Sequence, residues 1–117
     1  MRRAVDPDEF TEAWFAAWNA HDVEAVLAHF HEDAVFTSPY AAQIVPDSRG
    51  VAKGKEAIRA YWSTALESNP DLHFEPVNVY VGVQALVINY RNHRGDLVNE
   101  VLIFNGDTVI EGHGTYL

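Results

Sequence analysis

The stretch Trp14–Pro39, WFAAWNAHDVEAVLAHFHEDAVFTSP, decides the fold of this chain. It begins inside a predicted helix, because large apolar side chains recur every three or four positions over residues 10–18. Asp6 is expected to cap this helix, and Pro7 suits its first turn. Asp22 is expected to cap a second, shorter helix, whose buried side is Val23, Val26, Leu27 and Phe30.

The end of the same stretch changes to the period of a β-strand. Ala34, Phe36 and Ser38 alternate with the side chains between them, and Pro39, which has no backbone donor, ends the strand. Two helices followed by a strand predict a helical layer over a curved sheet. Such a layer encloses a pocket for a small molecule.

The remaining sequence predicts one more helix and four strands. Residues 40–53 look like a long irregular connection, and a helix is expected over 55–67, where Asn69 and Pro70 stop it. Turn signals separate the four predicted strands, at 72–80, 84–93, 96–104 and 108–116. Helices followed by a meandering antiparallel sheet indicate the α+β class.

These segments resemble the nuclear-transport-factor-2-like superfamily, in particular its SnoaL-like and ketosteroid-isomerase-like branches. The resemblance rests on the helix through Trp14 and Trp18, on NAHDVEAVLAHFHEDAVF, on the strand-ending SP, and on VAKGKEAIRAYW. It implies a single domain over residues 1–117, a cone-shaped barrel in which three helices pack on a curved, mostly antiparallel sheet. The same scaffold hosts isomerases, cyclases, dehydratases, epoxide hydrolases and binding modules, so it implies no single activity.

Composition excludes several classes of partner. The net charge of −9 argues against nucleic acids and anionic membranes, and the eight Lys and Arg are scattered. No signal peptide or apolar run of 18 residues is apparent, so a cytoplasmic protein is expected. There is no cysteine, and no histidine or carboxylate spacing is typical of a metal site. We therefore expect neither a metal nor another cofactor.

The predicted strands are apolar on both faces, as in the run Val101–Phe104. An antiparallel sheet with one wet face normally alternates polar and apolar residues. We therefore expect the second face to meet another copy of the chain, in a homodimer that packs sheet against sheet.

Glu100 is the leading candidate for chemistry, because it is a carboxylate within a long apolar strand. A two-residue turn at Arg94-Gly95 would place Asn89 directly opposite Glu100. In the last hairpin, a four-residue loop would place His113 opposite Glu100, and a two-residue turn would place Glu111 there. We favour the longer loop, since two facing carboxylates repel each other. Both options put His113 on the face of Glu100, whereas a three-residue loop would put the two on opposite faces.

Comparison with the ketosteroid isomerase branch limits the mechanism. Ser38 stands where that branch has its aspartate base, and Trp14 stands where it has a tyrosine, whereas Glu100 matches its second acid. Because a serine hydroxyl alone cannot take a proton from carbon at neutral pH, steroid-type isomerisation by that mechanism is not expected.

The sequence leaves two hypotheses open. In the first, a SnoaL-like, cofactor-independent isomerase, cyclase or lyase acts on an apolar carbonyl compound, with Glu100 and His113 as its acid–base pair. In the second, the protein is a non-catalytic binding or association module, and Glu100 is a structural carboxylate paired with Arg91 or His113. In either case the expected ligand-binding residues are Trp14, Trp18, Phe36, Ser38, Tyr40, Trp62, Asn89 and Leu102.

Overall fold

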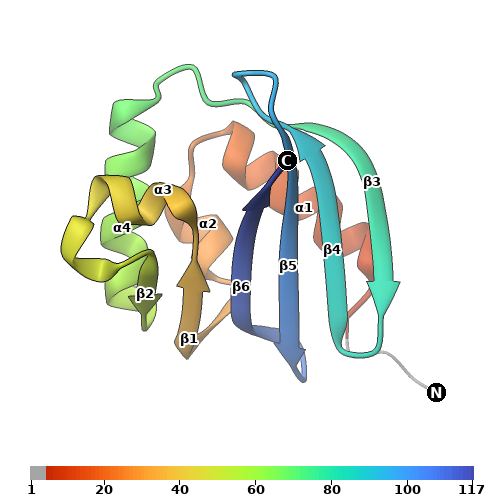
Figure 1. Cartoon of the computed structure of the whole chain (residues 1–117). Coiled ribbons are helices and arrows are strands. Elements are labelled where there is room, and N and C mark those ends of the chain that lie inside the picture. The colour runs from red at the N-terminus through yellow and green to blue at the C-terminus, as the bar shows by residue number, and fades with distance from the viewer. Residues whose placement is uncertain (1–4) are drawn as a thin grey trace.

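A six-stranded curved sheet with helices packed against it makes up the computed structural model, which describes residues 5–117 (Figure 1). The helices are α1 (Pro7–Asn19), α2 (Val23–Leu27), α3 (Pro39–Ile44) and α4 (Lys55–Ser68), with a 3-10 turn η1 (Pro46–Ser48). The strands are β1 (Phe30–Thr37), β2 (Val51–Lys53), β3 (Glu75–Gly82), β4 (Ala85–Arg91), β5 (Leu97–Asn105) and β6 (Thr108–Tyr116). The fold is of the predicted α+β class.

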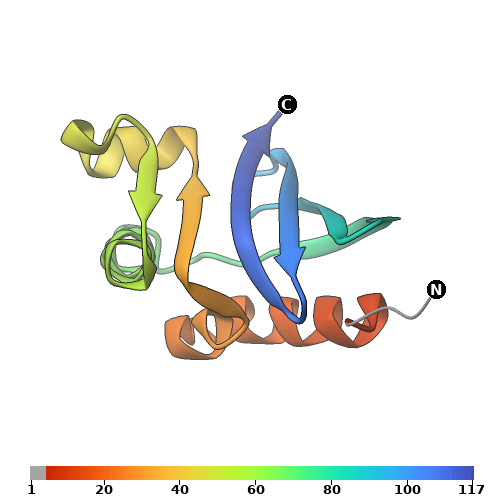
Figure 2. The same ribbon diagram turned by 90° about the horizontal axis from the view of Figure 1, so that it is seen from below.

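The strand order is β2-β1-β6-β5-β4-β3, and β1 runs parallel to β6 while the other neighbours are antiparallel. The sheet bends so that α1 crosses it on one side, and α4 lies beside β1 and β2 (Figures 1 and 2). This arrangement leaves the ends of the central strands facing α3, α4 and the loop between β4 and β5. None of the helices within residues 5–117 combines the length and apolar character needed to cross a bilayer.

Local capping explains where the first two helices begin. The Asp6 carboxylate accepts the backbone N–H groups of Asp8 and Glu9, both at 3.0 Å, as the sequence predicts. Asp22 caps α2 by accepting the Ala25 N–H at 3.1 Å. The second helix was predicted to reach residue 30, but it ends at residue 27, because the chain there turns into the parallel pairing of β1 with β6.

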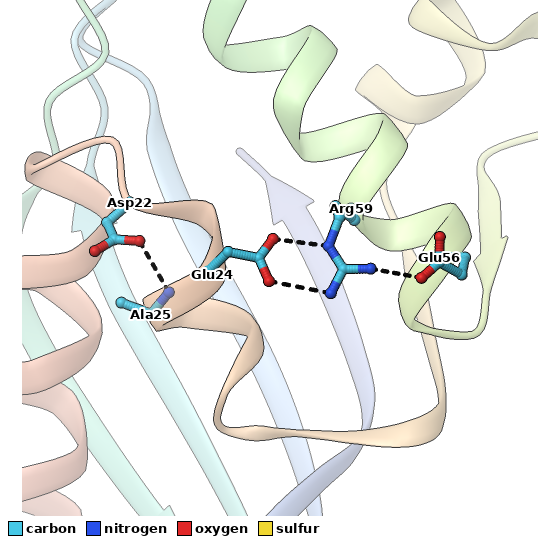
Figure 3. A network of polar contacts seen from close by, with 5 residues as sticks. All are labelled: Asp22, Glu24, Ala25, Glu56 and Arg59. Atoms are coloured by element: carbon cyan, nitrogen blue, oxygen red, sulfur yellow. Dashed lines mark hydrogen bonds and ion pairs between the residues drawn. The ribbon is translucent and has the colours of Figure 1, made fainter.

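An ion-pair network on the surface joins two of the helices. Arg59 of α4 donates to both carboxylate oxygens of Glu24 in α2, at 2.7 and 3.1 Å, and to Glu56 at 2.7 Å (Figure 3). The side chains are largely exposed, so this network contributes little to the free energy of unfolding. It links α2 to α4 at the surface.

The connection over residues 40–53, predicted to be irregular, is in fact ordered. Ser38 is the N-cap of α3, because its hydroxyl accepts the Tyr40 N–H at 3.2 Å, and Pro39 occupies the first helical position. After η1, residues Val51–Lys53 return along β1 as the antiparallel edge strand β2. Gly50 permits this return with a φ of +85°, and a Cβ there would lie 3.1 Å from the Ser38 carbonyl oxygen.

The predicted register of β4 and β5 is wrong. The connection is a five-residue loop, 92–96, in place of a two-residue turn, because the Asn92 side chain accepts the N–H groups of Arg94 and Asp96 at 3.0 and 2.9 Å. Glu100 therefore lies opposite Ile88. Asn89 pairs with Asn99 and donates to its side chain at 2.9 Å, so Asn89 lies on the other face of the sheet.

The register favoured for β5 and β6 is found beside the turn, where Phe104 pairs with Val109, but it does not hold at Glu100. The turn has two residues, since Asn105 pairs with Thr108, but an irregularity follows between Ile103 and Phe104 and shifts the pairing by one residue. Glu100 thus lies opposite Gly114, while His113 lies opposite Val101. Because neighbouring residues of a strand point to opposite faces, Glu100 and His113 lie on different sides of the sheet.

Candidate functional site

A cavity of about 90 Å³ opens between α4, the ends of the central strands and the 92–96 loop. Its walls are mainly aromatic, and the volume exceeds the roughly 10–15 Å³ that one water molecule requires. Of the residues that the sequence singles out, those that line it are Trp18, Phe36, Ser38, Tyr40, Trp62 and Glu100. Trp14, Asn89, Leu102 and His113 do not.

Glu100 is the only buried charged side chain within residues 5–117, with 6% of its surface exposed. Tyr90, from the neighbouring strand β4, donates its hydroxyl hydrogen to Oε1 of Glu100 at 2.8 Å. Burial raises the pKa of Glu100 to about 7, although the hydrogen bond from Tyr90 lowers it. The carboxyl group therefore exchanges a proton near neutral pH, as a general acid–base catalyst must.

Three tyrosines surround this carboxyl group and remain protonated at neutral pH. Burial raises the pKa of Tyr61 to about 12, and it raises the pKa of Tyr116 further. The pKa of Tyr90 is also well above its usual value, first through burial and then through the charge of Glu100. All three side chains line the cavity, and the hydroxyl group of Tyr90 is engaged with Glu100.

The wall beside Glu100 depends on a glycine. A Cβ on Gly114, which lies opposite Glu100 in β6, would sit 3.5 Å from Glu100 Oε1 and 3.5 Å from the Ser38 hydroxyl. Gly114 therefore keeps side-chain atoms out of the space between these two polar groups. Neither Gly114 nor Tyr90 was among the predicted site residues, although the alternation Leu86–Ile88–Tyr90 places Tyr90 on the apolar face of β4.

Trp18 reaches the cavity, whereas Trp14 lies behind its wall. The Trp14 ring packs against Phe74 and Tyr90, with ring centroids 5.7 and 5.4 Å apart, and those two rings line the cavity in its place. Trp18 is nine-tenths buried, and its indole N–H has no acceptor among the described residues. Leaving this buried donor unpaired is costly.

Leu102 and His113 are also separated from the cavity. Leu102 is fully buried and lies beside Gly112, as Phe36 does. A Cβ added to Gly112 would be 3.3 Å from the Leu102 side chain and 3.0 Å from the Phe36 ring. His113 lies on the outer face, with Nδ1 2.7 Å from the Thr37 hydroxyl and Nε2 3.7 Å from Glu111. The predicted pairing of His113 with Glu100 is therefore wrong.

Polar side chains gather at the mouth of the cavity. Arg94 of the 92–96 loop donates to the Asn69 side chain at 2.7 Å and to the Tyr40 hydroxyl at 3.5 Å. Asn92 and His93 of the same loop also line the mouth. Across residues 5–117, no three His, Cys, Asp or Glu side chains are grouped so that they could hold a metal ion.

Sequence and structure comparisons identify the family. The model of the SnoaL-like domain matches residues 11–113, and the chain belongs to this family. A SnoaL-like protein of unknown function from Burkholderia thailandensis is 39% identical, with a TM-score of 0.87 over 95% of this chain and 94% of that one. No curated protein sequence matches the chain.

More distant structures share the fold alone. TerC, co-crystallised with polyporic acid, is 13% identical, with a TM-score of 0.78 over 95% of this chain and 91% of that one. An NTF2-like protein of unknown function from Burkholderia pseudomallei is 14% identical, with a TM-score of 0.76 over 95% of this chain and 90% of that one. The SnoaL-like and nuclear-transport-factor-2-like resemblance predicted from the sequence is confirmed.

Proposed function

We propose that this protein is a cofactor-independent acid–base enzyme that acts on an apolar carbonyl compound, as an isomerase, cyclase or lyase. The observation that supports this proposal is Glu100, a buried carboxyl group on the wall of an aromatic cavity, with a pKa of about 7. A perturbed pKa within a cavity is typical of catalytic carboxyl groups.

The first step transfers a proton from carbon to Glu100. The ionised carboxylate takes the proton from the carbon next to the substrate carbonyl, the C–H electron pair moves into the adjacent bond, and the carbonyl oxygen becomes an enolate oxygen. Since Oε1 accepts the Tyr90 hydrogen bond, Oε2 is the oxygen that carries the transferred proton. Glu100 then returns the proton to another atom of the enolate, which completes an isomerisation.

Groups on the cavity wall can stabilise the enolate. The side chains of Tyr61 and Tyr116, whose hydroxyl groups are hydrogen-bond donors, line the same cavity as Glu100. Donors that are fixed before the reaction stabilise developing negative charge without reorganising. Proton transfer by a positioned carboxylate typically contributes roughly 10² to 10⁴ in rate.

The second candidate function is a non-catalytic ligand-binding module. It is favoured by Ser38, whose hydroxyl is engaged as the cap of α3, and by the absence of a second buried charged group within residues 5–117 that would relay the proton. On this view Tyr90 and Glu100 simply satisfy each other.

The two functions are separated by exchange of carbon-bound hydrogen. Ketones that carry one benzene ring, such as phenylacetone and 1-indanone, are incubated with the protein in D₂O, and deuterium uptake next to the carbonyl is followed by NMR. We expect Glu100→Gln to reduce the protein-dependent exchange by roughly 10² or more, because glutamine cannot accept the proton. Exchange that is absent in the wild type, for ketones that bind, would favour the binding module.

Glu111→Gln is the matched control for this experiment. It makes the same change in charge one strand away, at an exposed carboxylate on the outer face. Its exchange rate is expected to equal that of the wild type. An equal loss in both variants would show that net charge, and not the buried carboxyl group, determines the rate.

We also propose that two copies associate through the outer face of the sheet. Val87, Val101 and Ile103 lie there half-buried, and Tyr80 of the neighbouring edge strand β3, which pairs with Val87, is exposed on the same face. Apolar area of this kind on a sheet face is typical of an interface. Sedimentation velocity at micromolar concentration tests the association, and a monomer alone would contradict it.

A further inference from the structure

Arg94 is a fixed cation at the mouth of the cavity. Its loop is held by Asn92, whose side chain accepts two backbone N–H groups, and by Gly95, which adopts a φ of +85°. The guanidinium carbon lies 5.5 Å from the centre of the Tyr40 ring, and the side chain is part of the cavity lining. The loop therefore carries a positive charge to one end of an aromatic pocket.

Every contact of this guanidinium group is with a neutral partner. Asn69 and Tyr40 accept its hydrogen bonds, and within residues 5–117 no carboxylate forms an ion pair with it. Asp96, two residues along the loop, accepts from Asn92 instead, at 3.3 Å. Arg59, by contrast, binds two carboxylates.

An arginine that faces a pocket without an anionic partner fits an anionic ligand. Its planar group matches the two oxygens of a carboxylate, and the 3.5 Å contact with Tyr40 is long enough to be exchanged for a shorter one. The rest of the cavity wall is mainly aromatic. The chain as a whole is acidic, with a net charge of −9, so it would repel a ligand that carries several negative charges. A ligand with a single anionic group is therefore expected at Arg94.

We propose that the ligand is a carboxylic acid with a single apolar ring, whose carboxylate binds Arg94 while its ring enters the aromatic cavity. This inference rests on the pocket of the proposed function and names the class of molecule that it takes. The carboxylate lies at the mouth, and the ring lies toward Glu100 and Trp18.

Binding of a matched pair of probes tests the proposal. 3-Phenylpropionate and 3-phenylpropionamide have nearly the same shape and differ in charge. Each is titrated into ¹⁵N-labelled protein at pH 8, where 3-phenylpropionate is ionised, and binding is followed through the indole N–H signals of Trp18 and Trp62 and the backbone signals of the 92–96 loop. We expect the wild type to bind the carboxylate about tenfold or more tightly, as charge-assisted hydrogen bonds to arginine predict.

Three variants assign the preference to the guanidinium group. Arg94→Gln should bind both probes equally, with its affinity for the amide within about twofold of the wild type, because the neutral amide forms no ion pair with Arg94. Arg94→Lys should keep part of the preference, since it retains the charge but not the planar group. Arg49→Gln, which makes the same charge change at an exposed residue outside the lining, should keep the full preference.

The outcomes separate this proposal from the catalytic one. Equal affinities in the wild type, no binding of the carboxylate at millimolar concentration, or a preference that survives in Arg94→Gln would each overturn the carboxylate proposal. None of these measurements requires turnover. A carboxylate preference with no deuterium exchange would refute the catalytic function alone.

Discussion

The two faces of strands β4–β6 carry similar residues in very different surroundings. On the inner face, Glu100 is almost fully buried, accepts one hydrogen bond from Tyr90 and borders an aromatic cavity. On the outer face, the side chain of His113 is about one-third exposed and contacts Thr37 and Glu111. In sequence both are ionisable residues within apolar strands, and only the register assigns them to different faces.

This contrast shows that desolvation, more than residue type, prepares a group for chemistry. Burial on the inner face makes the charged form of Glu100 unfavourable and moves its pKa into the range where it can both accept and donate a proton. On the outer face, solvent and an exposed carboxylate are available to His113. Three changes, made on one face at a time, test this difference.

The largest expected effect is on the pH dependence of stability. The pKa of Glu100 is raised from 4.5 to about 7 in the folded protein, so the folded state binds more protons than the unfolded state between these values. The stability contributed by this protonation is complete below pH 4.5 and is lost as the pH rises through 7. The loss amounts to about 3 kcal/mol for the wild type, an upper value that water entering the cavity would reduce.

Glu100→Gln should remove this loss. Urea unfolding at several pH values from 4.5 to 8 measures the free energy of unfolding of both proteins. The variant should gain about 3 kcal/mol relative to the wild type over this range, because glutamine does not titrate. Glu111→Gln, on the exposed side, should give no comparable gain. If the difference in the free energy of unfolding between Glu100→Gln and the wild type does not change with pH, the pKa of Glu100 is the same in the folded and unfolded states. Glu100 would then be solvated in the folded protein.

A smaller effect is expected from Tyr90→Phe. The Tyr90 hydroxyl is a donor to Glu100, so its removal leaves the carboxylate without this partner and raises the pKa of Glu100 further. Loss of such a buried hydrogen bond costs about 1–3 kcal/mol, and the cost should be greater at pH 8 than at pH 5, because the ionised form is the one that loses more. Tyr80→Phe, at an exposed position of β3, is the control and should change little.

The titration of Glu100 itself provides the direct measurement. Its ¹³C carboxyl signal, followed by NMR, should shift at a higher pH in Tyr90→Phe than in the wild type. A midpoint that stays the same or falls would contradict the hydrogen bond from Tyr90 to Glu100.

Features that depend on neighbouring residues could be predicted from the sequence. The caps Asp6 and Asp22, the helix α4 and the strand β6 all follow from patterns within a few positions, and the structure confirms them. The cap of α3 was also predictable, since Ser38-Pro39 has the form of an N-cap and first helical residue. Pro39 also fits the end of a strand, which is the role that the alternation over residues 34–38 predicts for it.

Features that depend on distant residues could not be predicted in this way. The face on which His113 lies depends on one irregular pair in the last hairpin, and no local signal marks it. Trp14 and Trp18 share one side of α1, yet Phe74, which comes from far along the chain, covers Trp14 and leaves Trp18 at the cavity. Glu100 is different, because its burial could be predicted from the apolar residues beside it in the strand.

The smallest effect is expected from His113→Gln, on the outer face. The substitution removes the contact with the Thr37 hydroxyl, which is partly buried, so the free energy of unfolding should fall by about 1 kcal/mol or less. Deuterium exchange and its dependence on Glu100 should be unchanged, since the imidazole is separated from the cavity by the sheet. Combining His113→Gln with Glu100→Gln should give the sum of the two separate effects on stability, as expected for residues without a shared partner. A loss of exchange in His113→Gln as large as that in Glu100→Gln would place both side chains on one face, and the register of β6 would then have to be shifted by one residue.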